Sequence, residues 1–177
     1  MNVCAIIPAG GQGTRMGGTV PKQFQALKGK PVLHYTLRTL QESDLIDSLV
    51  LVVPEKELVN ARADWLNRPP VVKQVVVGGE KRQDSVFNGY QVLPKNTDIV
   101  LVHDGVRPFL SKEMIQETLE VADKFGAAIT AIPVNDTLKQ VNNSGTVLRT
   151  VEREGLWRVQ TPQAFRFDLL GEAFLKA

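Results

Sequence analysis

Short runs of consecutive apolar residues alternate along most of the chain with longer segments whose apolar residues recur at helical spacing. The runs predict buried strands at residues 3–7, 49–53, 71–77, 99–102 and 127–132. The longer segments predict helices at residues 31–40, 55–66, 82 to about 93, 111–125 and 168–177. Continuous apolar strands between amphipathic helices are typical of a mostly parallel sheet with helices on both faces. The pattern therefore predicts an α/β protein.

The pattern changes between residues 135 and 154, where polar residues predominate. Two short runs at 137–141 and 146–151 flank the turn sequence Asn-Asn-Ser-Gly, which predicts a two-stranded hairpin. A polar hairpin buries too little apolar surface to be stable alone. We therefore expect this segment either to lie on the body of the protein or to reach another subunit.

Composition and charge exclude several classes of protein. The chain has 177 residues, of which 43% are hydrophobic and 23% charged, as expected for one globular domain. Its net charge of +2 is too small to indicate a nucleic-acid or membrane partner. The single cysteine, Cys4, lies in the first apolar run, so we expect a core residue rather than a nucleophile. With no apparent membrane span or signal peptide, we expect a cytoplasmic protein.

Candidate chemistry begins directly after the first strand, in residues 8–22. Five glycines fall within nine positions there. Glycine allows a positive φ and a close approach of ligands to the backbone, and successive free N–H groups form a concavity for anions. Arg15 and Lys22 add two positive charges to the same segment. A strand that leads into a basic, glycine-rich loop is typical of a phosphate-binding site.

Two common phosphate-binding motifs do not fit this loop. A dinucleotide-binding fingerprint needs a third glycine where the chain has Met16. A P-loop needs Gly-Lys and then Ser or Thr after four spacer residues, and no window supplies that sequence. The string Gly-x-Gly-x-Arg-Met-Gly with Pro-Lys-Gln is similar instead to the loop of nucleotidyltransferases that join a sugar or polyol phosphate to a nucleoside triphosphate.

A second motif follows the predicted strand at 71–77. Gly78, Gly79 and Glu80 come directly after it, and Ser85 stands near the start of the next helix. Backbone N–H groups and a hydroxyl at a helix start suit a base or ribose pocket. The alternative is a simple strand-to-helix turn in which Asp84 or Ser85 caps the helix.

A third motif follows the predicted strand at 99–102. Asp104 is a candidate ligand of Mg²⁺, because this ion usually takes one or two protein carboxylates together with substrate phosphates. Arg107 could bind a second phosphate as a two-pronged donor. The alternative is that Asp104 and Arg107 pair with each other and brace the loop. We expect a structural role for His103, since no second histidine or cysteine stands near it.

A fourth motif spans residues 152–157 and 160–165, where Arg153 is a candidate for gripping a phosphate and Thr161 offers a hydroxyl. The four motifs together resemble the 2-C-methyl-D-erythritol 4-phosphate cytidylyltransferase family of the non-mevalonate isoprenoid pathway. The resemblance runs from residue 2 to about residue 170. It rests on these sequence motifs: Gly-Gln-Gly-Thr-Arg-Met-Gly with Pro-Lys-Gln, Gly-Gly-x-x-Arg-Gln-Asp-Ser-Val, His-Asp-x-x-Arg-Pro, Asn-Asp-Thr, and Gly-Leu-Trp with Gln-Thr-Pro-Gln. It implies one nucleotidyltransferase domain over residues 1–177, with a Rossmann-like sheet and a projecting β-arm at about 135–154 that makes a homodimer.

The resemblance also implies roles for individual residues. Cytosine and ribose would be held by Ala9, Gly10, Gly11, Gly79, Glu80 and Ser85. Arg15 and Lys22 would bind the triphosphate and stabilise the transition state, and Asp104 would bind Mg²⁺ beside the acceptor. The acceptor phosphate would be bound by Arg107 and Thr161, with Thr137 and Arg153 supplied by the partner's arm. The reaction would be attack of the acceptor's phosphate oxygen on the α-phosphorus of CTP, with release of pyrophosphate.

Two alternatives stay open at this point. One is a ribitol 5-phosphate cytidylyltransferase of the same fold, although Glu-Arg-Glu-Gly-Leu-Trp favours the methylerythritol enzyme. The other is a nucleotide-binding or dimerisation module without turnover. It is suggested by the expectation that the family's C-terminal tail, some tens of residues with a further basic residue, is absent from this chain.

Overall fold

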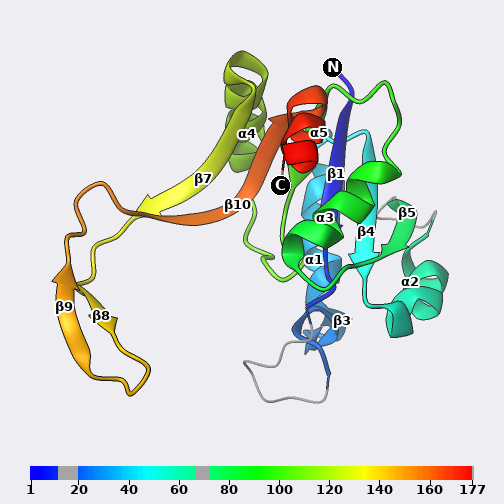
Figure 1. The fold of residues 1–177 in the computed structure, drawn as a ribbon. Coiled ribbons are helices and arrows are strands. Elements are labelled where there is room, and N and C mark those ends of the chain that lie inside the picture. Colours follow the sequence, from blue (N-terminus) through cyan, green and yellow to red (C-terminus); the bar gives the residue numbers. More distant parts are fainter. Residues whose placement is uncertain (12–19, 67–71, 177) are drawn as a thin grey trace.

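A six-stranded sheet forms the centre of the computed structural model, which describes residues 1–11, 20–66 and 72–176 (Figure 1). The strands are β1 (Val3–Pro8), β4 (Ser48–Val53), β5 (Val72–Val77), β6 (Ile99–Val102), β7 (Ala127–Pro133) and β10 (Trp157–Arg166). Their order is β5-β4-β1-β6-β10-β7. Neighbours among β5, β4, β1 and β6 are parallel, whereas β10 runs antiparallel to both β6 and β7. The predicted α/β class with a mostly parallel sheet is confirmed.

Helices cover both faces of this sheet, as the sequence predicted. They are α1 (Val32–Glu42), α2 (Leu58–Trp65), α3 (Arg82–Gln91), α4 (Lys112–Phe125) and α5 (Phe167–Lys176). Successive β1 residues alternate between two cores: Ile7 belongs to the core that includes residues of α1, α2 and α4, whereas Ile6 belongs to the core that includes residues of α3 and α5. None of the helices in the described part of the chain is long and apolar enough to cross a bilayer.

The boundaries of α4 illustrate how local sequence sets an element. The Ser111 side chain accepts a hydrogen bond from the backbone N–H of Met114, at 3.2 Å, and so caps the first turn as predicted. Gly126 ends the helix at φ +91°, a left-handed conformation that favours glycine. The predicted helix at 55–66 differs: residues Glu55–Glu57 form a 3-10 turn before α2 begins at Leu58.

Strand β10 has no counterpart among the predicted elements. Its sequence contains Pro162, which cannot donate to a ladder and usually argues against a central strand. The structure accommodates this proline in an irregularity between Val159 and Gln163, where the pairing with β7 shifts register. From Gln163 onward, β10 pairs with β7 on one side and with β6 on the other, so this part of the strand lies inside the sheet.

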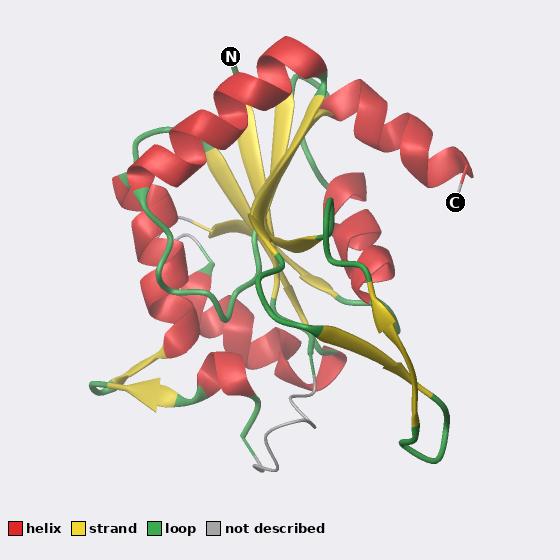
Figure 2. Cartoon of the chain, turned by 90° about the vertical axis from the view of Figure 1, so that its left-hand side faces the viewer, coloured by secondary structure: helices red, strands yellow, loops and turns green. Residues whose placement is uncertain are grey.

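The polar segment forms the predicted hairpin from β8 (Leu138–Val141) and β9 (Val147–Val151), which pair antiparallel. Figures 1 and 2 both show it projecting away from the body, beyond the ends of β7 and β10. Nearly all of its residues are exposed. The first possibility left by the sequence, a hairpin that lies on the body, is therefore wrong. Contact of the hairpin with another subunit stays a prediction. We call residues 135–154 the arm.

Candidate active site

A cavity of about 500 Å³ opens where the carboxyl ends of β1, β5 and β6 meet. This is the edge at which open α/β sheets bind ligands. Its walls contain all six residues predicted to hold the nucleotide, namely Ala9, Gly10, Gly11, Gly79, Glu80 and Ser85. Lys22 and Asp104 also line it. Residues predicted for one site but far apart in the sequence are thus brought together.

Backbone hydrogen bonds hold the nucleotide side of the cavity on the sheet. The N–H of Ala9 donates to the carbonyl of Val52 at 2.7 Å, which continues the β1–β4 ladder past the end of β1. Gln23 is 2% exposed, and its amide Nε2 donates to the carbonyls of Ala9 and Gly11. The side chain of Gln23 therefore fixes the start of the glycine loop. Sequence reasoning included it in Pro-Lys-Gln without giving it a role.

The second motif combines the two interpretations that the sequence left open. Ser85 is 5% exposed, and its hydroxyl accepts from the N–H of Gly79 at 3.1 Å. Asp84 accepts from the N–H of Lys81 at 2.9 Å and completes a capping box at the start of α3. A Cβ at Gly79 would lie 2.2 Å from the Cβ of Asp84, so the turn closes only with glycine. Asp84 therefore caps the helix, while Ser85 and Gly79 shape the cavity wall beside it.

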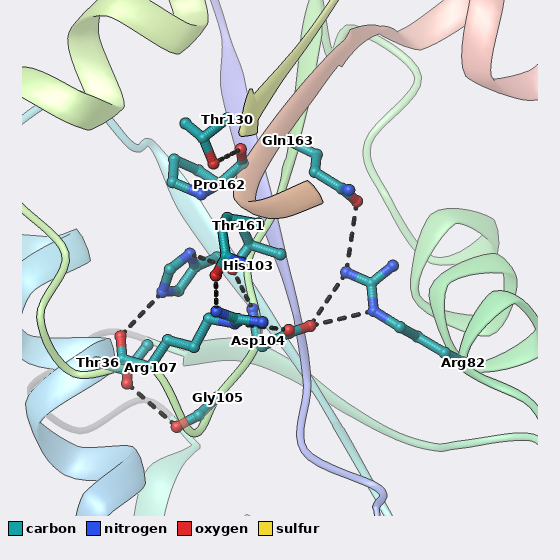
Figure 3. A network of polar contacts seen from close by, with 11 residues as sticks. Thr36, Arg82, His103, Asp104, Gly105, Arg107, Thr130, Thr161, Pro162 and Gln163 are labelled. Carbon is teal, nitrogen blue, oxygen red and sulfur yellow. Dashed lines mark hydrogen bonds and ion pairs between the residues drawn. The ribbon is translucent and has the colours of Figure 1, made fainter. Parts of the chain in front are cut away.

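Asp104 lies between two arginines (Figure 3). Arg82, on α3, donates from Nε to Oδ1 of Asp104 at 3.1 Å, and Arg107 donates from Nε to Oδ2 at 3.0 Å. The predicted alternative of an Asp104–Arg107 pair is thus present. Sequence reasoning missed Arg82, although it stands in Gly-Gly-x-x-Arg-Gln-Asp-Ser-Val. One carboxylate facing two guanidinium groups leaves an excess positive charge, which suits an anionic ligand.

Two glutamines of β10 accept hydrogen bonds from the guanidinium groups of these arginines. The guanidinium of Arg82 donates to Oε1 of Gln163 at 3.4 Å, and that of Arg107 donates to Oε1 of Gln160. Each arginine is therefore oriented by one glutamine and by Asp104. Both glutamines flank Thr161 in Gln-Thr-Pro-Gln, but the sequence did not indicate which side chains they would contact, because β10 itself was not predicted.

His103 is buried beneath this network, in agreement with the structural role expected for it. Its Nδ1 lies 2.9 Å from the hydroxyl of Thr161, and its Nε2 lies 3.1 Å from the carbonyl of Arg107. Burial lowers the pKa of the imidazole below its usual value. Thr161 is buried too, and its Oγ1 accepts from the N–H of Asp104 at 3.3 Å. Its hydroxyl is thus already engaged with the protein.

The donor set at Asp104 bears on Mg²⁺ binding. No group of three or more His, Cys, Asp or Glu side chains suited to a metal occurs within residues 1–11, 20–66 and 72–176. The carboxylate offers about four lone-pair positions, and hydrogen bonds from the two guanidinium groups occupy two of them. Asp104 therefore fits an ion that is held mainly by substrate phosphates, which is the usual manner of Mg²⁺.

The remaining predicted site residues are not gathered around this cavity within one chain. Thr137 and Arg153 are exposed and belong to the arm, where Arg153 donates to the carbonyl of Asn135. Arg107 and Thr161 do not line the cavity themselves, but each is hydrogen-bonded to Asp104, which does. Arg15 falls outside the described residues.

Comparison with known proteins gives a consistent result. Residues 3–177 match the model of the family IspD, described as 2-C-methyl-D-erythritol 4-phosphate cytidylyltransferase. The chain is 43% identical over 178 residues to the protein of that name from Syntrophus aciditrophicus, covering 99% of this chain and 76% of the relative. It is 45% identical over 177 residues to the one from Pelotomaculum thermopropionicum, covering 99% and 74% respectively.

Solved structures agree with the sequence comparison. The 2-C-methyl-D-erythritol 4-phosphate cytidylyltransferase of Thermus thermophilus superposes with a TM-score of 0.75 at 32% identity, over 100% of this chain and 76% of that one. The 4-diphosphocytidyl-2C-methyl-D-erythritol synthase of Anaerococcus prevotii superposes with a TM-score of 0.77 at 30% identity, over 99% and 77% respectively. Neighbours of this kind share the Rossmann-like arrangement of the sheet.

Proposed function

Because the chain belongs to the 2-C-methyl-D-erythritol 4-phosphate cytidylyltransferase family, we propose that it transfers CMP from CTP to 2-C-methyl-D-erythritol 4-phosphate. A phosphate oxygen of the acceptor forms a bond to the α-phosphorus of CTP, and the bond to the β-phosphate oxygen breaks to release pyrophosphate. The observation that carries this proposal is the cavity in which Lys22, Asp104 and all six nucleotide-binding candidates meet.

The proposed chemistry needs positioning and charge rather than a base. The acceptor phosphate is already ionised, so the difficulty is to bring two anions together and to stabilise charge at the α-phosphorus. We assign the triphosphate to Arg15 and Lys22, and the acceptor phosphate to Arg107. These cations would act as preorganised electrostatic stabilisers. Lys22 lines the cavity, which supports its assignment.

Mg²⁺ is part of the proposal as the ion that neutralises the triphosphate. Asp104 would hold it through a lone pair that the arginines leave free, while the nucleotide phosphates supply further oxygen ligands. Arg82 and Arg107 keep the carboxylate in the cavity wall. The chain's own contribution is thus to orient Asp104 before any substrate arrives.

We further propose a homodimer that forms through the arm. Four apolar side chains are each more than 40% exposed, namely Leu148 on the arm, Ile132 on β7, and Trp157 and Val159 on β10. Exposed apolar side chains of this kind are typical of an interface. Thr137 and Arg153 would then reach the partner's acceptor site. A cytoplasmic location, where CTP is available, belongs to the same proposal.

Pyrophosphate release with different substrate pairs tests the function directly. With 2-C-methyl-D-erythritol 4-phosphate as acceptor, CTP should be used well and ATP, GTP and UTP poorly, and a chelator should abolish turnover. Ribitol 5-phosphate should be a poor acceptor under the same conditions. Preference for ribitol 5-phosphate would change the assigned acceptor, and equal rates with a purine triphosphate would contradict the assigned nucleotide.

A further inference from the structure

The loop that carries Asp104 and Arg107 is tied to β10 by a continuous chain of hydrogen bonds. The N–H of Asp104 lies 3.3 Å from Oγ1 of Thr161, this oxygen lies 2.9 Å from Nδ1 of His103, and Nε2 of His103 lies 3.1 Å from the carbonyl oxygen of Arg107. His103 is 1% exposed and Thr161 6% exposed, so water does not compete with these bonds. This series of hydrogen bonds thus begins and ends on the same loop and passes through Thr161 of β10 (Figure 3).

The direction of each bond in this chain follows from the groups themselves. The carbonyl of Arg107 can only accept, so Nε2 of His103 must carry a proton. The backbone N–H of Asp104 can only donate, so the oxygen of Thr161 accepts there. The one proton of the hydroxyl then pairs with Nδ1, which must be an acceptor. A proton on Nδ1 would instead leave the hydroxyl proton without a partner in this buried position.

The rest of the loop is held to other elements. The N–H groups of His103 and Gly105 donate to the carbonyls of Ile6 and Pro8, each at 3.1 Å, and the hydroxyl of Thr36 on α1 donates to the carbonyl of Gly105 at 3.1 Å. These contacts hold the loop against β1 and α1. Loss of the Thr161–His103 bond would therefore remove one of the loop's ties to β10. The bond from Arg107 to Gln160 of β10 and the anchors to β1 and α1 would stay in place.

We propose that His103, as the neutral Nε2–H tautomer, and Thr161 are positioning residues that set the loop bearing Asp104 and Arg107. The proposal rests on the function proposed above. It gives Thr161 a role different from the one that the family resemblance implies, because the proton of its hydroxyl is donated to His103 and is not available to an acceptor phosphate. Thr161 then acts on the acceptor only through the placement of Arg107 and Asp104.

The tautomer can be tested in the wild-type protein without any turnover. The chain contains two histidines, so the imidazole nitrogens of ¹⁵N-histidine-labelled protein are few, and a His34→Gln variant assigns them by removing the other ring. Above neutral pH, we expect His103 to show a protonated Nε2 and an unprotonated Nδ1. The Nδ1 resonance should move in Thr161→Val and stay in place in Thr161→Ser. An Nδ1–H tautomer, or an Nδ1 resonance unaffected by Thr161→Val, would overturn the proposal.

Kinetics then separate positioning from direct contact. We expect Thr161→Val and His103→Gln each to lower kcat/KM for the acceptor by about 10–100-fold if the two residues act through one hydrogen-bond network. This is the usual loss when a residue that orients a site residue is removed. The double variant should be no worse than the more damaging single variant. Thr161→Ser should restore most of the activity, and KM for CTP should change little.

Direct contact between Thr161 and the acceptor predicts a different pattern. Thr161→Val would then raise KM for the acceptor, His103→Gln would remain close to wild type, and the two effects would add. That result in variants shown to be folded by thermal unfolding would overturn the proposal. If the wild-type protein turned over neither acceptor, the proposed function would fail, whereas the NMR measurement would still decide the role of the hydrogen-bond chain.

Discussion

The cavity and the arm differ in what holds their side chains in place. Around the cavity, Gln23, Ser85 and His103 are buried, and each makes hydrogen bonds to neighbouring backbone or side-chain groups. On the arm, Thr137 and Arg153 are exposed, and the hairpin is supported mainly by its own β8–β9 ladder. One half of the proposed site is therefore preorganised within a single chain, whereas the other half needs a surface to lie on.

This contrast teaches that one sequence can divide a proposed site between a part held in place within the chain and a part that projects from it. A two-stranded hairpin is marginally stable in water unless it packs against something. The arm nevertheless carries residues that the family resemblance places at the acceptor. A second copy of the chain is the partner that would stabilise the arm and complete both sites at once.

The largest expected effect is on the preorganised side. Lys22→Ala should lower kcat by about 10²–10³-fold, because it removes one fixed charge from the cavity. Lys22→Arg should not restore the rate, since a planar fork replaces a point charge. Steady-state pyrophosphate release measures both variants, with exposed Lys56→Ala as the matched control. A Lys22→Ala enzyme with near-normal kcat would remove this residue from the mechanism.

A mixing experiment tests whether the arm completes the partner's site. Lys22→Ala and Arg153→Ala homodimers should each be almost inactive. When equal amounts exchange chains, about half of the dimers are mixed, and each mixed dimer has one site with both substitutions and one with neither. Activity should then recover to about a quarter of the wild-type value.

The control for this experiment is an independent measure of chain exchange, such as native mass spectrometry of chains labelled with different isotopes. If exchange is complete and no activity returns, Arg153 serves its own chain or none. The contrast between a cavity formed by one chain and an arm that serves the other would then be wrong.

A smaller effect is expected from matched glycine substitutions in the two regions. Gly79→Ala would place a Cβ 2.2 Å from that of Asp84, so it should lower the free energy of unfolding by about 1–3 kcal/mol. Gly145→Ala in the arm meets no atom within 4 Å but sits at φ +81°, so its strain of about 1 kcal/mol should stay within the hairpin. Denaturant unfolding should therefore detect the first variant and hardly the second. A larger loss in Gly145→Ala would mean that the arm unfolds together with the body.

Much of the site could be predicted because its residues lie where strands end. Gly10, Gly79 and Asp104 each follow a parallel strand, and parallel strands bring their carboxyl ends to one edge. The contacts of Arg82 could not be predicted in the same way. Its partners Asp104 and Gln163 are 22 and 81 residues away, and a single sequence carries no signal for pairings at such distances.

The sequence by itself determined the elements whose pattern is local. Apolar runs, helical spacing and turn residues specify the parallel strands, the covering helices and the hairpin, because each depends on neighbours a few residues away. Only the tertiary structure decided the place of β10. Pro162 weakens the strand signal, and the strand exists because β6 and β7 supply its hydrogen-bond partners on both sides. With β10 in place, Thr161 comes to lie against His103, and the loop that bears Asp104 acquires its second anchor.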